Sequence, residues 1–156
     1  MTKTIKLSVE EARELYKKAD STFKSFLETN FDKKELCSEI EERIQNWQDI
    51  LDELGIDESF LPYKNPKTKE EKSLNAVAKI YKITEVYNEG WYADFKNNDY
   101  KWYPYKYFSG GRFLVAFYWY CSVTDGHAGG FYFKSENLAK DAYNKFKDVY
   151  EDYWMI

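Results

Sequence analysis

The sequence predicts a single α+β domain in which helices come first, a three-stranded antiparallel meander follows, and a last helix packs on the sheet. Residues 8–90 carry apolar side chains at helical spacing behind capping signals. Residues 100–134 are rich in aromatic and β-branched side chains and are interrupted only by SGG and TDGHAGG. Residues 135–153 return to helical spacing. Because 156 residues is a usual size for one domain, we predict one domain over 1–156.

Capping signals place the first helices. Ser8 and Glu11 have the spacing of a capping box, which begins a helix of about three turns. Asp20 offers a second helix start, so we expect a separate short helix there. Asp32 with Glu35 repeats the box and predicts a short helical turn before the next helix.

A longer amphipathic helix is predicted next, because apolar residues recur at steps of four, three, four and three and a glycine follows. The stripe consists of Ile40, Ile44, Trp47, Leu51 and Leu54, and Gly55 suits a left-handed C-terminal position. A coiled-coil seam is the alternative, but the pattern lasts only about two heptads where a coiled coil needs three or four.

Another helix is predicted from Thr68, which with Glu71 forms a capping box, to Gly90. Its predicted buried stripe is Leu74, Val77, Ala78, Tyr81, Thr84 and Tyr87, widened by Ile80 and Ile83. A final helix begins after Ser135, and its regular stripe predicts that it lies across the sheet.

The middle strand of the meander is predicted over Arg112–Thr124, where alternation separates two faces. Phe113, Val115, Phe117, Trp119, Cys121 and Val123 form the predicted core face, and Leu114, Ala116, Tyr118, Tyr120 and Ser122 form the other. Pro104 lacks a backbone donor, so the first strand should lie at a sheet edge or bend there. The third strand is predicted over 131–134.

Composition excludes several classes of protein. A net charge of −4 and a pI near 5.2 argue against a dedicated duplex-binding protein. No apolar run reaches the ~20 residues of a membrane span, and the first residues lack the apolar region of a secretory signal. We therefore expect a cytoplasmic protein without a membrane partner. Cys37 and Cys121 are expected to be reduced, packed thiols, and no metal or cofactor is predicted.

Several segments resemble a group of phage proteins. These are NEGW at 88–91, YKWYPY at 100–105, FKSENLAKDAYNKF at 133–146, and an early stretch with Ala12, Leu15, Tyr16, Phe31 and ELC at 35–37. In them the chain resembles small uncharacterised proteins encoded by bacteriophages and prophages, notably of gut Bacteroidales. The resemblance implies a phage-associated origin, and it implies no activity, catalytic residue or ligand.

His127 is the one residue that suggests catalysis, because it follows Asp125-Gly126 between two strands. A histidine beside an aspartate can act as a general base or bind a metal. The favoured interpretation is a turn residue, since Asp-Gly supplies the turn geometry by itself. No serine elbow, phosphate-binding glycine loop or paired-histidine motif accompanies it, so we predict that the protein is not an enzyme.

The predicted binding site is the first hairpin. Its aromatic and cationic side chains are Lys101, Trp102, Tyr103, Tyr105, Lys106, Tyr107 and Arg112. Three interpretations stay open: rings packed within the fold, a protein interface, or a platform for single-stranded nucleic acid, on which bases stack while cations meet phosphate. The predicted function is non-catalytic binding of a host or phage protein, for example in anti-defence. Alternatives are a single-stranded nucleic-acid-binding module and a small enzyme.

Overall fold

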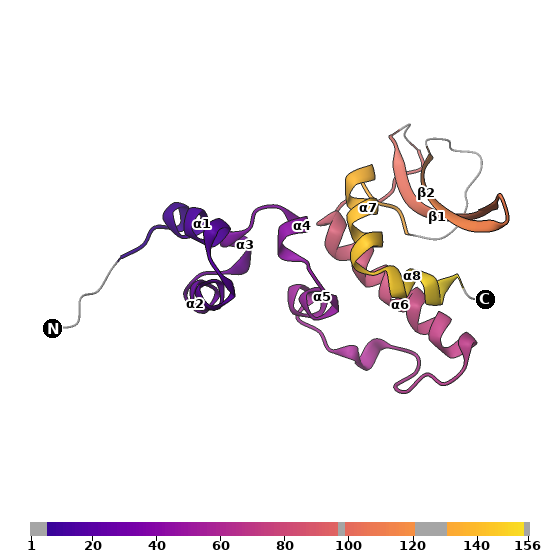
Figure 1. Ribbon diagram of the computed structural model, residues 1–156, viewed down its shortest axis with the longest axis horizontal. Helices are drawn as coiled ribbons and strands as arrows, with labels where there is room; N and C mark the ends of the chain where they lie inside the picture. Colours follow the sequence, from indigo (N-terminus) through magenta and orange to yellow (C-terminus); the bar gives the residue numbers. More distant parts are fainter. Residues whose placement is uncertain (1–5, 97–98, 121–130, 155–156) are drawn as a thin grey trace. The chain divides into compact units, whose positions relative to one another are not determined.

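The computed structural model describes residues 6–96, 99–120 and 131–154, without the side chains of 118–120. The chain has α+β structure, as predicted, and forms two compact units, Met1–Ile44 and Gln45–Ile156, which are described separately (Figure 1). The single domain over 1–156 stays a prediction. Among the described residues, no helix is both long and apolar enough to cross a membrane.

The described part of the N-terminal unit, from residue 6 onward, contains α1 (Val9–Lys18), α2 (Ser21–Asn30), α3 (Lys33–Leu36) and α4 (Ile40–Arg43). The predicted caps of the first three are confirmed. The Ser8 hydroxyl accepts from the Glu11 N–H while the Glu11 carboxylate accepts from the Ser8 N–H, and Asp20 caps α2. Asp32 and Glu35 form the second capping box. The core of the unit consists of Ala12, Tyr16, Leu27, Leu36 and Cys37.

The long helix predicted from Ile40 to Leu54 is wrong, because the chain forms α4 and a separate helix α5 (Trp47–Leu54). The Asn46 side chain accepts from the N–H groups of Gln48 and Asp49, and the Asp49 carboxylate accepts from the Asn46 N–H. This capping box gives the backbone a helix start that outweighs the continuous apolar stripe. Gly55 ends α5 in the left-handed region, at φ 63°, as predicted.

The C-terminal unit is built around α6 (Lys69–Asn88). The 3-10 turn η1 (Glu58–Phe60) precedes α6, and the hairpin β1 (Lys101–Ser109) and β2 (Arg112–Tyr120) follows. The predicted C-terminal helix is two helices, α7 (Glu136–Lys145) and α8 (Lys147–Tyr153), since the backbone leaves helical geometry at Phe146. Helix α7 contacts both strands, and α7 and α8 both contact α6 (Figure 1). Of the predicted C-terminal helix, α7 is thus the part that packs on the sheet.

Helix α6 buries part of the predicted stripe, namely Ile80, Ile83, Thr84 and Tyr87, but two of the predicted residues are exposed. Leu74, which we placed in the stripe, is 46% exposed, and Tyr81 is also exposed. Asn75 is buried instead, because its amide donates to the Tyr63 carbonyl over 2.7 Å and accepts from the Tyr63 N–H over 2.9 Å. Ser73 is buried and donates to the Tyr153 carbonyl. In the first half of α6, polar side chains that bind the backbone of other segments are thus buried in place of Leu74.

The three-stranded meander is not confirmed, because the described residues form a two-stranded antiparallel sheet. The predicted turn is confirmed, with Gly110 and Gly111 at φ 59° and 78°, the positive values that a two-residue hairpin turn requires. Phe133 forms one bridge, and it bonds to Trp102 of β1 instead of to β2. The next backbone on that edge belongs to Pro104, which has no N–H, so the ladder cannot continue.

The predicted core face of the middle strand is only partly covered. Phe117 is half-buried, and its ring lies 5.8 Å from that of Tyr143 on α7. Phe113, nearer the turn, is 67% exposed, so its assignment to the core is wrong. The ring contact with α7 is made at Phe117, and the exposure of Phe113 shows that the turn end of the hairpin is uncovered. Cys121 and Val123, the remainder of that strand and His127 lie outside the described residues, as does the side chain of Trp119.

The observed face of α6 can be tested by a matched pair of truncations. Ile80→Ala removes a fully buried side chain and should lower the free energy of unfolding by about 2–5 kcal/mol. Leu74→Ala removes a largely exposed one and should cost under about 1 kcal/mol. Urea denaturation followed by circular dichroism measures both. Equal losses would show that Leu74 is buried, as its place in the apolar stripe predicted.

Candidate functional site

The strand register divides the hairpin side chains between two faces. Trp102, Pro104, Lys106 and Phe108 pair in the register with Trp119, Phe117, Val115 and Phe113, and the described side chains among these residues form the helix-side face. Lys101, Tyr103, Tyr105, Tyr107, Arg112, Leu114 and Ala116 belong to the other face, which we call the tyrosine face. The predicted site is thereby split: Trp102 and Lys106 lie on the helix-side face, and the other five residues lie on the tyrosine face.

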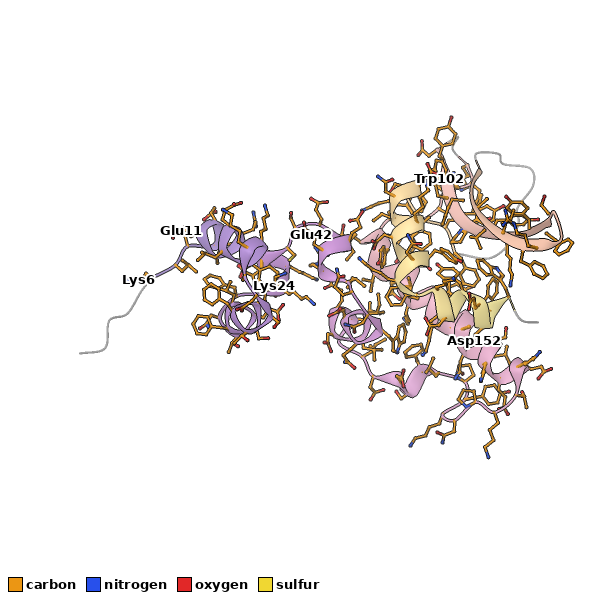
Figure 2. The ribbon with its side chains drawn as sticks, in the orientation of Figure 1. Lys6, Glu11, Lys24, Glu42, Trp102 and Asp152 are labelled. Atoms are coloured by element: carbon orange, nitrogen blue, oxygen red, sulfur yellow. The ribbon has the colours of Figure 1, made fainter. Side chains whose placement is uncertain are left out.

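The tyrosine face is a ladder of rings that contact one another. The Tyr103 ring meets those of Tyr132 and Tyr105 edge to face, at centroid distances of 5.5 and 6.4 Å. Tyr105 and Tyr107 are stacked at 6.3 Å with planes 9° apart. Tyr105 is 44% exposed, whereas Tyr103 and Tyr107 are half-buried. Trp102, on the helix-side face near the start of β1, is also half-buried (Figure 2). One of the four predicted rings is therefore largely exposed.

The three cations of the hairpin have different surroundings. Lys101 is 1% exposed; its ammonium donates to the Asp99 carbonyl over 2.8 Å and lies 5.5 Å from the centre of the Phe95 ring. Our prediction that Lys101 belongs to an exposed binding surface is therefore wrong. The Lys106 ammonium lies 4.9 Å from the Phe113 ring and 5.7 Å from the Trp154 ring. Arg112 is exposed next to the turn.

Among the hairpin side chains that the structure describes, the most exposed rings are two that the predicted site omitted. Phe108 and Phe113 are 63% and 67% exposed, lie opposite each other across the strands, and form an edge-to-face pair at 5.2 Å. The signal was present in FSGGRF, because a two-residue turn places these rings on one face, beside each other. We call Lys106, Phe108, Arg112 and Phe113 the hairpin-end cluster.

The hairpin also differs in charge from the remainder of the chain. Residues 100–124 contain Lys101, Lys106 and Arg112 and no Asp or Glu, which gives +3. The remainder has 23 − 3 = 20 basic and 27 acidic residues, which gives −7. A local positive potential on an acidic protein steers anionic partners toward that place.

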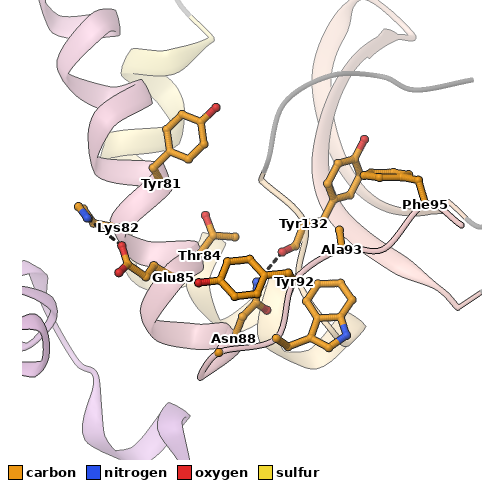
Figure 3. A pocket seen from close by; sticks show the side chains of 11 residues that line it. Tyr81, Lys82, Thr84, Glu85, Asn88, Tyr92, Ala93, Phe95 and Tyr132 are labelled. Carbon is orange, nitrogen blue, oxygen red and sulfur yellow. Dashed lines mark hydrogen bonds and ion pairs between the residues drawn. The ribbon is translucent and has the colours of Figure 1, made fainter. Parts of the chain in front are cut away.

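Apart from the hairpin, a pocket of about 750 Å³ lies between the C-terminal turns of α6, the following loop and Tyr132 (Figure 3). Its rings are Tyr81, Trp91, Tyr92, Phe95 and Tyr132. The amide of Asn88 donates to the Tyr132 carbonyl over 2.7 Å, and Lys82 pairs with Glu85 at 2.8 Å (Figure 3). Because these polar groups already have partners, the pocket offers a ligand chiefly aromatic surface.

The described residues give little support to nucleophilic or metal chemistry. They contain no cluster of three or more His, Cys, Asp and Glu side chains that could hold a metal ion. Cys37 is a buried free thiol whose pKa is raised, first by desolvation, which disfavours the reactive thiolate. Tyr16 donates to Glu28, and its pKa is raised, first by burial and then by that hydrogen bond.

Comparison of the chain with models of protein families, with curated proteins and with solved structures finds no match in any of the three. The resemblance to phage and prophage proteins stays a prediction from the sequence. The candidate site is therefore defined by the residues of this chain, namely the hairpin-end cluster and the tyrosine face beside it.

The burial of Lys101 predicts a large effect of truncation. Lys101→Ala removes a packed stem and a charge-assisted hydrogen bond, and should lower the free energy of unfolding by about 1.5–3 kcal/mol. Lys101→Met keeps most of the stem and should recover part of the loss. Arg112→Ala, at an exposed position, should change stability by no more than about 0.5 kcal/mol. Equal values for Lys101→Ala and Arg112→Ala, measured by urea denaturation, would place the Lys101 ammonium in solvent.

Proposed function

We propose that this protein acts by binding another protein through the hairpin-end cluster, without catalysis. The observation that carries the proposal is the exposed pair of Phe108 and Phe113. Single exposed apolar side chains are ordinary, but two rings in contact, flanked by cations, expose adjoining apolar surface to water. Aromatic side chains and arginine are the types that contribute most to protein interfaces.

The surroundings of the hairpin cations favour a protein partner over single-stranded nucleic acid. A nucleic-acid platform needs several cations along the backbone path to neutralise phosphates. Lys101 is buried and Lys106 is half-buried near two rings, so of the three hairpin cations Arg112 is the exposed one. The exposed ring of Tyr105 supports nucleic acid as the second candidate, since a base could stack on it.

The resemblance to phage and prophage proteins favours a host or phage protein as the partner, and interference with host defence is one function of this kind. Small phage-encoded accessory proteins that lack catalytic groups can act only through what they bind. Within the host cell, an acidic body with a cationic, aromatic hairpin would select its partner by charge and by insertion of the two rings.

A double substitution at the hairpin end tests the proposal. Phe108→Ser with Phe113→Ser should leave the fold intact, because both rings are largely exposed, and should weaken partner binding by about 2 kcal/mol or more, roughly 30-fold. The matched control is Phe23→Ser with Phe26→Ser on α2, which removes a second pair of exposed rings in contact, stacked instead of edge to face. Affinity capture from infected host cells with quantitative mass spectrometry identifies the partner, and titration of the purified partner gives the affinities.

Two results would contradict the proposal. A partner that binds wild type and the hairpin double variant equally well would remove the hairpin-end cluster from the interface. Tight binding of single-stranded oligonucleotides, with a steep salt dependence that is reduced by Tyr105→Ser and Arg112→Ser, would favour the second candidate, since phosphate contacts release counterions.

A further inference from the structure

We infer that the partner segment binds as an extended, carboxylate-bearing strand that hydrogen-bonds along the outer edge of β2. This inference rests on the proposed function and specifies how the partner is held. The outer edge is the row of backbone N–H and C=O groups of Phe113, Val115 and Phe117 that points away from β1. In this mode, main-chain bonds provide affinity and alternate side chains provide selectivity.

The turn fixes which backbone groups point outward. A two-residue turn makes its flanking residues, Ser109 and Arg112, a hydrogen-bonded pair, and this pairing alternates along an antiparallel ladder. Leu114 and Ala116 therefore bond to β1, while Phe113, Val115 and Phe117 direct their backbone groups outward. Trp102 confirms the same alternation on β1, since its backbone groups face away from β2 and bond to Phe133 at 3.0 and 2.7 Å.

The two edges of the hairpin differ in their capacity to accept a strand. On β1 the outer edge is occupied at Trp102 and interrupted at Pro104, so no continuous row of donors exists. On β2 no proline occurs between Arg112 and Tyr120, and in the part of the chain that the structure describes no strand pairs with its outer edge. A long edge of apolar and aromatic residues is a ready template for another strand.

Charge selects the kind of strand. The hairpin carries +3, and Lys106 and Arg112 lie at the end of the sheet where Phe113 is exposed. If a second copy of this chain paired through its own β2, its hairpin would bring the same cations close to Lys106 and Arg112, and like charges at close range repel. Side chains at alternate positions of a partner strand lie on one face, so alternate carboxylates complement the cation on that face, either Arg112 on the tyrosine face or Lys106 on the helix-side face. The exposed Phe113 ring gives it an apolar contact on the same face as Lys106.

Synthetic strands test the inference with the wild-type protein. The probe is the acetylated and amidated peptide Thr-Glu-Val-Glu-Val-Glu-Thr, compared with its Lys counterpart and with a form N-methylated at alternate residues. The acidic peptide should bind at least about tenfold more tightly than either of the others, because one control reverses the charge and the other removes edge donors. Nuclear magnetic resonance titration measures the affinities.

Hydrogen exchange locates the bound strand. The amides of Phe113, Val115 and Phe117 should exchange rapidly in the free protein and become protected when the acidic peptide is bound. Amides that are already protected in the free protein would overturn the inference, because the edge would then be occupied. Equal binding of the acidic and Lys peptides would overturn its charge argument, and equal binding of the N-methylated peptide would overturn strand addition.

Val115→Pro is the complementary change in the protein. It removes one outward N–H at an edge position, where proline is tolerated, and should weaken the acidic peptide about tenfold. Val115→Ala, the matched control, shortens the side chain, keeps the N–H, and should bind as wild type does. If the natural partner is lost in the Phe108 and Phe113 double variant but retained by Val115→Pro, the proposed function stands and strand addition is wrong. If neither variant changes partner binding, both fail.

Discussion

The buried side chain of Asn88 connects the last turn of α6 to the hairpin, and the arrangement of the C-terminal unit depends on it. Its amide donates to the Tyr132 carbonyl over 2.7 Å and accepts from the Lys134 N–H over 3.1 Å. Between these two residues, Phe133 exchanges two backbone hydrogen bonds with Trp102 at the start of β1. A satisfied buried amide is directional, so it holds this segment in one register where apolar contact alone would permit sliding.

Rings and one further hydrogen bond extend this connection to α7 and α8. Tyr87, beside Asn88, meets Phe133 edge to face at 6.1 Å and Phe146 at 6.4 Å, and its hydroxyl donates to Asp141 on α7 over 2.7 Å. The hairpin is therefore anchored at the end where β1 begins and where α7 lies. Its turn end, which bears Phe108 and Phe113, is the uncovered end. A firmly held base with an exposed apolar end is the arrangement from which we infer protein binding.

Much of the fold could be predicted from local signals, since caps and turns involve residues three or four apart. Three capping boxes are present as predicted, and they begin at Ser8, Asp32 and Thr68. The hairpin turn at Gly110 is also present as predicted. Apolar periodicity was less reliable. It predicted one helix where the box at Asn46 makes two, and it assigned Leu74 to the core in place of Asn75, whose burial depends on Tyr63, twelve residues away. The candidate site was predicted only in part, because exposure depends on how far the helices extend along the hairpin.

The sequence by itself determined the α+β class, the hairpin turn, the cationic character of the hairpin and the helix starts at Ser8, Asp20, Asp32, Thr68 and Ser135, because each depends on residue type and short spacing. Only the tertiary structure decided that Lys101 is buried against Phe95 and that Phe108 and Phe113 are exposed. It also decided that Phe133 pairs with β1. These outcomes depend on contacts between segments far apart in the chain. The alternation and composition of a segment do not specify which other segment will pack against it, for example whether Phe133 pairs with β1 or with β2.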